Sequence, residues 1–463
     1  MAFATVNPYT NEVVKEFPEA TEQDVQAALA RGHEAYEAWR ETSFEERAKL
    51  MKNIGALLRR DAEKLARLAA LEMGKVLAEG KAEAILSAQI CEYYAENLAE
   101  LLEPEDLKLS DPKMGRAKLV YEPQGIVLAI EPWNFPYYQV LRIVAPQLSA
   151  GNAVLLKHAG NLPQCAAACQ ELVEEAGAPK GLFQNIYMPH KFTEMVLDDP
   201  RTCGVALTGS ERAGSIVAGA AGKALKKATM ELGGSDAFIV LDDADLEKTV
   251  KWAVFGRHWN AGQVCVSAKR IIVVDSLYDR FVELYKKGIA ELRAGDPLDP
   301  NTNFAPLASQ QAADDLREMV EKAVKQGAKA ETIPVAVPNQ GAFFQPVVLT
   351  ELDENNEARH WEFFGPVSQL YRAKDENDAV RIANDSPYGL GGAIFSRDEA
   401  RAVRVASKIR TGMVFINHPT TTKAELPFGG IARSGYGREL MSLGIKEFVN
   451  HKLVNVMDID SPF

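Results

Sequence analysis

The sequence predicts an α/β protein that contains two separate, mostly parallel β-sheets. Short apolar runs recur from about residue 150 onward, and helical segments of about 10 to 20 residues separate them. Strands of parallel sheets are buried on both faces, so they read as continuous apolar runs. We expect one sheet before residue 233 and another after it. The expected strands are AVLLK at 153–157, FQNIY at 183–187, CGVALTG at 203–209, AFIVL at 237–241, RIIVV at 270–274, FQPVVL at 344–349, GGAIFS at 391–396 and MVFIN at 413–417.

The first third of the chain predicts helices. The segment SFEE at 43–46 matches a capping box, and helical apolar spacing continues from it to Glu72. Gly74 then ends this helix. No internal repeat, low-complexity tract or linker follows, so we expect closely packed domains.

Two segments predict strands outside this alternating pattern. Residues 117–131, AKLVYEPQGIVLAIE, predict a hairpin that turns at the triplet PQG, 123–125. The segment KLVNVMD at 452–458 predicts a lone strand after a helix, and such a strand needs an edge to pair with. Pairing with another subunit is one solution, and docking on the 117–131 hairpin is the other.

Length and charge narrow the class of protein. A chain of 463 residues predicts roughly two to three domains. Its net charge is −12, and it has no long run of lysine or arginine. We therefore expect no nucleic acid and no membrane as a partner.

The five cysteines predict neither disulfides nor a metal site. They are odd in number, and no pair has the spacing of zinc ligands. The N-terminus has no secretory pattern, and no apolar run approaches the roughly 18 residues that span a bilayer. We expect a reducing compartment, the cytoplasm, with four of the cysteines as packing residues: Cys91, Cys165, Cys169 and Cys203.

The fifth cysteine is a candidate nucleophile. Cys265 follows the small, polar turn NAGQV at 260–264, where a ligand can approach the backbone closely. A thiolate attacks carbonyl carbon readily. A lone cysteine also occurs as a small buried apolar residue, so Cys265 needs supporting motifs.

Three further motifs supply polar groups at the ends of predicted strands. Glu231 in MELGGS is either a helix-capping anion or a buried general base with a raised pKa. Asn134 in PWNFP offers an amide N–H for an oxyanion, or is a turn residue. The TGS motif at 208–210, with Gly214 beyond it, predicts a strand, turn and helix N-terminus that can bind a pyrophosphate. The G-x-G-x-x-G fingerprint is absent from the strand–helix junctions.

Taken together, the motifs PWNFP, LLKHAG, LTGS, MELGG, GQVC, FFGPV and LPFGG resemble the aldehyde dehydrogenase superfamily in order and spacing, from about residue 5 to the end. The resemblance implies a Rossmann-like dinucleotide-binding domain over 1–112 and 131–233. It also implies an α/β catalytic domain over 234–446. A small β flap, 113–130 with 447–463, would join subunits into homodimers or homotetramers.

The resemblance also implies roles for individual residues. Cys265 matches the nucleophile, Glu231 the base that activates the deacylating water, and Asn134, with the Cys265 N–H, the oxyanion hole. The implied activity is oxidation of an aldehyde to an acid through a cysteine thiohemiacetal and thioester. The residues that match positions along the dinucleotide are Trp133, Lys157, Gly209, Ser210, Leu232, Glu362 and Phe364.

The chain departs from the family pattern after the strand at 153–157. Family members that prefer NAD carry a glutamate that binds the adenosine ribose, and Gly160 stands at that position. A 2′-phosphate would then meet Lys157 without an opposing anion. We therefore expect the enzyme to prefer NADP; the alternative is that Gly160 only relaxes discrimination and both NAD and NADP are used.

The substrate is narrowed by a second resemblance. KHA, the short N-terminus and GRHWNAGQVC are similar to a group of bacterial succinate-semialdehyde dehydrogenases. Arg142 matches an arginine that binds the substrate carboxylate there, and its alternative is a helix-surface arginine in a salt bridge. A second arginine of some such enzymes is replaced by Trp259. Trp259 could form a wall for aliphatic or aromatic aldehydes, so a broad-specificity enzyme stays an alternative, as does a catalytically silent structural member.

Overall fold

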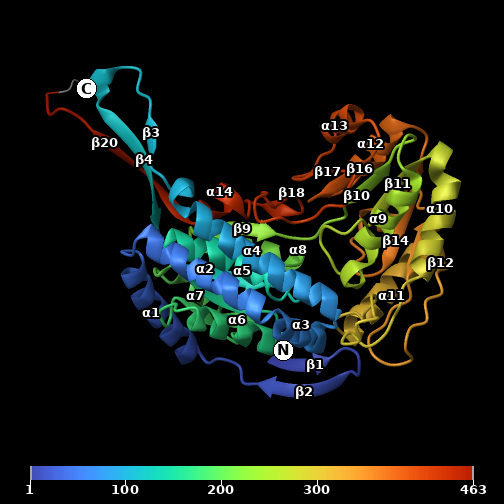
Figure 1. The fold of residues 1–463 in the computed structure, drawn as a ribbon, viewed down its shortest axis with the longest axis horizontal. Helices are drawn as coiled ribbons and strands as arrows, with labels where there is room; N and C mark the ends of the chain where they lie inside the picture. Colours follow the sequence, from blue (N-terminus) through green and yellow to red (C-terminus); the bar gives the residue numbers. More distant parts are fainter. Residues whose placement is uncertain (1–2, 461–463) are drawn as a thin grey trace.

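Residues 3–460 are described by the structure, a computed structural model, and they form two α/β bodies and a projecting β arm (Figure 1). The first body contains a six-stranded sheet of order β19-β9-β8-β5-β6-β7. Its strands pair in parallel except β19, which is antiparallel to β9. The strands are β5 (Ile126–Glu131), β6 (Ala153–His158), β7 (Phe183–Asn185), β8 (Thr202–Thr208), β9 (Lys227–Glu231) and β19 (Gly435–Tyr436).

Helices of the N-terminal half pack around this sheet (Figure 1). The capping box predicted at Ser43 is confirmed, since Ser43 and Glu46 exchange side-chain bonds with each other's backbone N–H. The expected single helix is two helices that meet at Asp61, and the second ends at Gly74 in the left-handed conformation. The helices are α1 (Glu22–Trp39), α2 (Phe44–Arg60), α3 (Ala62–Met73), α4 (Leu77–Leu101), α5 (Tyr138–Ala150), α6 (Pro163–Glu175), α7 (Thr193–Asp198) and α8 (Glu211–Lys223).

The second body contains a seven-stranded sheet of order β12-β13-β14-β11-β10-β16-β17, in which β12 alone is antiparallel. The prediction of two sheets divided near residue 233 is confirmed, except that β19 returns to the first sheet. The strands are β10 (Ala237–Val240), β11 (Arg270–Val274), β12 (Lys329–Thr332), β13 (Val347–Thr350), β14 (Val367–Ala373), β16 (Gly392–Phe395) and β17 (Phe415–Ile416). The helices are α9 (Leu246–His258), α10 (Asp275–Ala290), α11 (Gln310–Lys325), α12 (Glu376–Asn384) and α13 (Glu399–Ala406).

The projecting arm is a three-stranded antiparallel sheet of order β20-β4-β3 (Figure 1). It joins β3 (Glu105–Leu107), β4 (Arg116–Pro123) and β20 (Val449–Val456). The predicted 117–131 hairpin is wrong, because Gly125 turns the chain at φ 146° and β5 enters the six-stranded sheet. The C-terminal strand docks on β4 of its own chain, as the second alternative expected. The proposed division into domains stays a prediction. The segment 113–130, which was expected to belong to the flap, contains β4 of the arm and also most of β5, which belongs to the six-stranded sheet.

Short elements complete the architecture. None of the helices within residues 3–460 is long and apolar enough to cross a membrane. The short strands are β1 (Phe3–Asn7), β2 (Glu12–Phe17), β15 (Tyr388–Gly389) and β18 (Ile431–Ala432), and the short helices are η1 (Pro112–Met114), η2 (His190–Phe192), η3 (Trp259–Gly262), η4 (Glu357–His360) and α14 (Met441–Ile445).

Candidate active site

Cys265 lies in the wall of a cavity of about 310 Å³ between the two bodies. It follows η3, in which Asn260 and Ala261 adopt left-handed φ angles of 50° and 53°. Such backbone is strained in residues other than glycine and is common at functional sites. Its thiol is half-buried, and burial raises the pKa of Cys265 to about 12. The resting side chain is therefore a neutral thiol that needs a base to become a nucleophile.

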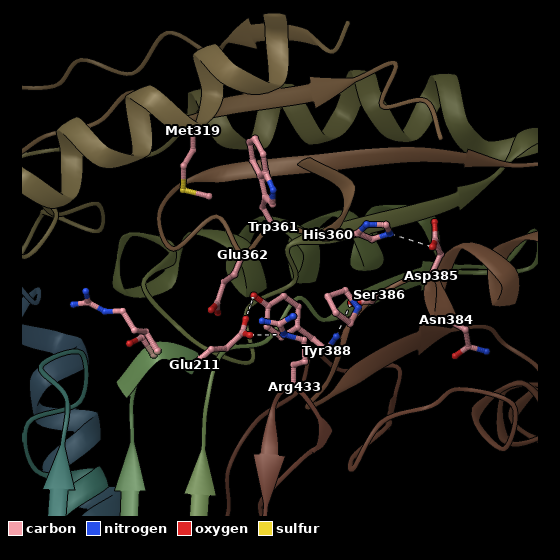
Figure 2. Close-up of a pocket in the computed structure, with 13 residues that line it drawn as sticks. Glu211, Met319, His360, Trp361, Glu362, Asn384, Asp385, Ser386, Tyr388 and Arg433 are labelled. Carbon is pink, nitrogen blue, oxygen red and sulfur yellow. Dashed lines mark hydrogen bonds and ion pairs between the residues drawn. The ribbon is translucent and has the colours of Figure 1, made fainter. Parts of the chain in front are cut away.

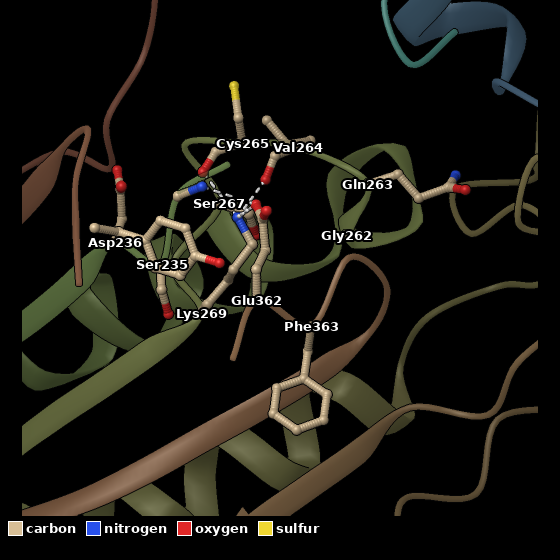
Figure 3. A network of polar contacts seen from close by, with 12 residues as sticks. Ser235, Asp236, Gly262, Gln263, Val264, Cys265, Ser267, Lys269, Glu362 and Phe363 are labelled. Carbon is tan, nitrogen blue, oxygen red and sulfur yellow. Dashed lines mark hydrogen bonds and ion pairs between the residues drawn. The ribbon is translucent and has the colours of Figure 1, made fainter. Parts of the chain in front are cut away.

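A buried lysine holds the backbone of Cys265, the candidate nucleophile. The Lys269 ammonium donates to the carbonyl oxygens of Val264 at 2.7 Å and Cys265 at 2.8 Å. It also pairs with the Glu362 carboxylate at 3.1 Å, and that carboxylate accepts the Gly234 N–H at 3.0 Å. Figure 3 shows this network, with the Cys265 side chain directed away from it. The network fixes the loop and leaves the sulfur free.

Asn134 lies against the same loop. Its Nδ2 donates to the Gln263 carbonyl at 3.0 Å, and its Oδ1 accepts from Gln139 Nε2 at 3.1 Å. Asn260 Nδ2 in turn donates to the Asn134 carbonyl at 3.0 Å. The structure thus brings Asn134 and Cys265 together, and it holds the amide in one orientation.

Glu231 ends β9 and is 2% exposed. Neither of its carboxyl oxygens has a hydrogen-bond partner among residues 3–460, so Glu231 is not the capping anion of the alternative interpretation. Burial, and next the charge of Glu439, raise the pKa of Glu231 well above its usual value. In its ionised form, such a carboxylate is a stronger base than an ordinary one.

Arg142 is not at the helix surface and does not line the cavity. Its guanidinium is 1% exposed and forms a buried ion pair with Glu439. It also donates to Tyr138 Oη at 2.8 Å and to Thr208 Oγ1 at 3.1 Å. Arg142 therefore forms a salt bridge, as the alternative interpretation expected. This salt bridge lies in the interior of the protein and not on the helix surface, behind the part of the cavity wall that Tyr138 forms.

The cavity walls are mainly apolar and aromatic. Trp259 lines the cavity, as expected of a substrate wall, and stacks on Phe255 with ring centroids 5.8 Å apart. Its ring also tilts against Phe135 at 5.4 Å. The lining residues are Lys75, Ala78, Glu79, Ala82, Glu83, Leu86, Phe135, Tyr138, Gln139, Phe255, Trp259, Asn260, Val264, Cys265, Val266, Thr421, Thr422 and Phe428.

A larger cleft of about 850 Å³ has Glu362, the carboxylate that pairs with Lys269, in its lining (Figure 2). Both bodies line it, since Ser210 and Glu211 come from the first and Glu362 and Tyr388 from the second. Ser210 caps α8 by accepting the Ala213 N–H. The first turn of this helix therefore offers N–H groups to an anion, as the TGS motif predicted.

The structure also shows the surroundings of four more predicted dinucleotide positions. Leu232 packs on Gly214 of α8, where a side chain larger than glycine would clash with it. The rings of Trp133 and Phe364 meet edge to face with centroids 5.6 Å apart. Gly209 separates β8 from α8, and only the Leu207 side chain lies within 4 Å of where its Cβ would be.

The Lys157 ammonium fits a phosphate group. Lys157 is the penultimate residue of β6, is 5% exposed, and pairs with no residue that the structure describes. Burial lowers the pKa of Lys157 to about 8. Gly160 follows three residues later, and its carbonyl accepts the Ala4 N–H at 3.0 Å. An anion beside Lys157 would restore a compensating charge to a buried cation.

The remaining cysteines are free thiols, with Cys91, Cys165 and Cys169 buried and Cys203 half-buried. Among residues 3–460, no group of three or more histidine, cysteine, aspartate or glutamate side chains could hold a metal ion.

The model of the family "Aldehyde dehydrogenase family" matches residues 1–454. The chain belongs to the aldehyde dehydrogenase family. The predicted family, α/β fold and aldehyde-oxidising class of enzyme are therefore confirmed.

Individual relatives are similar over nearly the whole chain. The succinate-semialdehyde dehydrogenase [NADP(+)] of Deinococcus radiodurans is 48% identical, over 98% of this chain and 94% of the relative. Succinate-semialdehyde dehydrogenase [NADP(+)] 1 of Mycobacterium tuberculosis is 44% identical, over 98% and 99%. The solved succinic semialdehyde dehydrogenase of Streptococcus pyogenes, in complex with NADP+, is 44% identical with a TM-score of 0.96, over 99% of this chain and all of that one.

Sequence reasoning missed several residues of the site. Lys269 lies four positions after Cys265 and directly before the strand β11. A lysine next to an apolar strand is a signal that the sequence does offer. Glu439 lies 297 positions from Arg142, and nothing in the sequence pairs them. Glu131 ends β5, and its carboxyl is buried without a hydrogen-bond partner within the described residues, which the apolar pattern of the strand does not indicate.

Proposed function

We propose that this chain oxidises succinate semialdehyde to succinate and prefers NADP as the hydride acceptor. The observation that carries the proposal is the half-buried Cys265 thiol in the wall of a cavity, with the buried acid Glu231 near enough to raise the pKa of the thiol. The relatives named above, two of them NADP(+) enzymes by name, support the choice of substrate and cofactor.

In the first step, the Cys265 sulfur attacks the aldehyde carbon as the thiol proton leaves to a base. The carbonyl oxygen becomes an oxyanion, which Asn134 Nδ2 and the Cys265 N–H stabilise by hydrogen bonds. Asn134 must give up its bond to the Gln263 carbonyl, or share it, to do so. The Lys269 contacts keep the nucleophile's backbone still while the new C–S bond forms.

A bound nicotinamide supplies hydride acceptance, which leaves a thioester on Cys265. Glu231 then takes a proton from water, and the water oxygen attacks the thioester carbon. The C–S bond breaks, the thiol is restored, and the acid leaves. Cleavage by water is proposed because Glu231 is present, buried and free to accept a proton.

The preference for NADP rests on Lys157 and Gly160. Lys157 offers an unpaired ammonium, and Gly160 removes the carboxylate that would repel a 2′-phosphate. We further propose that Trp133, Gly209, Ser210, Leu232 and Phe364 line the rest of the dinucleotide. Glu362 would bind the nicotinamide ribose from its place between Lys269 and Gly234.

The test is absorbance at 340 nm with succinate semialdehyde, butanal and benzaldehyde, each with NADP and with NAD. The proposal expects the highest kcat/KM for succinate semialdehyde with NADP. Equal or higher kcat/KM for the two uncharged aldehydes would replace it with the broad-specificity alternative. No reaction with any pair would favour the catalytically silent alternative.

We also propose that the arm joins subunits into a homodimer or homotetramer. The outer edge of β20 is unpaired in the described sheet, and Leu453, Val454 and Val456 are 61%, 41% and 56% exposed. An exposed apolar edge strand needs cover to avoid aggregation. Light scattering measures the mass, and a monomer at all concentrations would contradict the proposal.

The five free thiols support a reducing compartment, and we propose the cytoplasm. Cell fractionation with an antibody tests this, and recovery from an oxidising compartment would contradict it.

A further inference from the structure

We propose that Glu79 positions the turn that carries Cys265, and that its ionised carboxylate thereby speeds the attack of the sulfur on the aldehyde. Glu79 is a positioning residue in this proposal, because it acts through the backbone of Asn260 and not on the reacting atoms. The inference rests on the proposed function, since it assigns a role to Glu79 only if Cys265 is the nucleophile.

The turn η3, which leads to Cys265, has an unfavourable backbone conformation. Asn260 and Ala261 follow each other in the left-handed region, at φ angles of 50° and 53°. The left-handed region is costly for residues that carry a Cβ atom, and such residues persist there only where their surroundings fix them. The contacts of η3 therefore determine how firmly the sulfur is placed.

Glu79 supplies a charged contact to this turn. It lies in the first turn of α4, and both of its carboxyl oxygens accept the Asn260 N–H, at 3.0 Å and 3.1 Å. Because α4 packs in the first body and η3 follows α9 of the second, this contact joins the two bodies beside the cavity that Glu79 lines. An ionised acceptor forms a hydrogen bond roughly twice as strong as a neutral one.

Asn260 transmits this restraint to the reacting groups. Its Nδ2 donates to the Asn134 carbonyl at 3.0 Å and to the Gln263 carbonyl at 3.3 Å. The Asn260 carbonyl in turn accepts Gln263 Nε2 at 3.1 Å. Asn134 is the proposed oxyanion donor, and Gln263 stands two positions before Cys265. A shift of the Asn260 backbone would therefore move the oxyanion donor and the sulfur relative to each other.

The charge of the Glu79 carboxyl changes near neutral pH. Burial raises the pKa of Glu79 to about 7. The charged groups that face it are Lys75, just before α4, and Glu83 of the same helix, and these two form an ion pair with each other. Glu79 is therefore an ionised acceptor above about pH 7 and a neutral acceptor below it.

Other titratable groups near the turn and in the cavity keep their charge over the same range. Arg257 is fully buried and donates to backbone carbonyl groups of its own body. Burial lowers the pKa of His258 to about 3, so this imidazole is neutral. Burial raises the pKa of the Cys265 thiol and of the Tyr138 hydroxyl, so both are neutral as well. Among these groups, Glu79 is the one that titrates near pH 7.

The test is the rate of the first turnover with saturating aldehyde and NADP, measured at 340 nm by rapid mixing at about pH 6 and about pH 8. Glu79→Gln keeps an oxygen that can accept the Asn260 N–H, but this oxygen cannot become charged. Its rate should match the unmodified enzyme at the lower pH and be about 3- to 30-fold slower at the higher pH. Succinate semialdehyde and butanal should show the same change, because the turn and not the substrate is affected.

Two further variants complete this comparison. Glu79→Ala leaves the Asn260 N–H without its acceptor, so it should be about 10- to 100-fold slower at both pH values, with little change in KM. The glutamine variant should therefore restore the rate at the lower pH alone. Glu96→Ala removes an exposed glutamate of the same helix and is the matched control, which should follow the unmodified enzyme.

Alkylation of Cys265 by iodoacetamide separates positioning from a change in the thiol itself. The reagent reacts with the thiolate and needs no oxyanion donor, so its rate reports how far the thiol is ionised. In Glu79→Gln, the alkylation rate on the Cys265 peptide should stay within about twofold of the unmodified enzyme at both pH values. A fall in alkylation as large as the fall in the first turnover would mean that Glu79 acts on thiol ionisation, and would overturn the positioning role.

The remaining outcomes separate this inference from the proposed function. If the unmodified enzyme oxidises aldehydes and Glu79→Gln matches its rate at both pH values, the inference is wrong and the proposed function stands. If Glu79→Gln is slowed equally at both pH values, the loss is merely structural and the inference is again overturned. If the unmodified enzyme forms no NADPH with any aldehyde, the proposed function fails, and the inference fails with it.

Discussion

The Lys269 ammonium donates a hydrogen bond to the carbonyl oxygen of Cys265 across 2.8 Å, and the lysine side chain is fully buried. One cation therefore connects the backbone of Cys265 to Glu362, which lines the larger cleft. Because Lys269 contacts both groups, a shift of the Cys265 backbone would also shift the Glu362 carboxylate, which we propose to bind the ribose.

Replacing this cation should destabilise the protein and slow the reaction. Lys269→Met leaves the Val264 and Cys265 carbonyls and the Glu362 carboxylate without their donor. We expect the free energy of unfolding in urea to fall by about 2 to 4 kcal/mol, with a lower kcat. Lys322→Met, which removes an exposed ion pair with Glu318, is the control and should change stability by less than about 1 kcal/mol. Equal effects of the two variants would refute the role of Lys269.

Glu231→Gln should separate the two halves of the reaction. The glutamine cannot take a proton from water, so the thioester on Cys265 should accumulate after one turnover. A rapid-mixing experiment at 340 nm should show a burst, followed by a steady state about a hundredfold slower than the unmodified enzyme. In the unmodified enzyme the steady-state rate should rise with pH, because only the ionised Glu231 is a base and burial raises its pKa. An unchanged steady-state rate in the variant would exclude Glu231 as the base.

The buried carboxyl of Glu131 should make the free energy of unfolding depend on pH. Burial, and next the charge of Glu439, raise the pKa of Glu131 well above its usual value. A raised folded pKa means that the stabilising contribution is present below the unfolded pKa and is lost as pH rises toward the folded value. Glu131→Gln should therefore lose less stability than the unmodified protein as the pH rises above the ordinary carboxyl pKa of about 4.3, by up to about 1.4 kcal/mol per pH unit.

The measurement for Glu131 is urea unfolding across that pH range. The exposed carboxyl of Glu247 supplies the control, and Glu247→Gln should follow the unmodified protein. Parallel curves for Glu131→Gln and the unmodified protein would show that the buried carboxyl does not titrate as argued.

Gly160→Glu should move the cofactor preference toward NAD. The new carboxylate would repel a 2′-phosphate beside Lys157 and could accept bonds from a free ribose hydroxyl. We expect kcat/KM for NADP to fall about 10- to 100-fold, with a smaller change for NAD. Gly160→Gln has the same size without the charge, so it separates repulsion from steric effects. A glutamate variant that still prefers NADP would mean that position 160 does not face the adenosine ribose.

The sequence predicted those parts of the fold that local patterns determine. Buried parallel strands such as 153–157 and 270–274 read as apolar runs, and the structure places β6 and β11 there. The hairpin at 117–131 was wrong for a physical reason. Alternation and a turn triplet predict two strands, but they do not say which sheet each strand joins, and the contact of Ile126 N–H with the Arg201 carbonyl decides that.

The residues of the candidate site that stand in short motifs could be predicted from the sequence. The residues that come close to them only through the fold could not. Cys265, Glu231 and Asn134 stand in short motifs, and the structure brings Asn134 and Cys265 to one loop. The surroundings of Arg142 depend on Glu439 and Tyr138, which are distant in sequence or ordinary in type. Only tertiary packing shows that the guanidinium is buried and already paired.

The central claim is that the Cys265 sulfur carries the aldehyde during its oxidation. The most direct measurement is intact mass spectrometry of Glu231→Gln after a single turnover with succinate semialdehyde and NADP. We predict a mass increase equal to one succinyl group, located on the peptide that contains Cys265 and absent when Cys265→Ala is added. NADPH formation by the Cys265→Ala variant at the rate of the unmodified enzyme, with no adduct in either protein, would contradict the account.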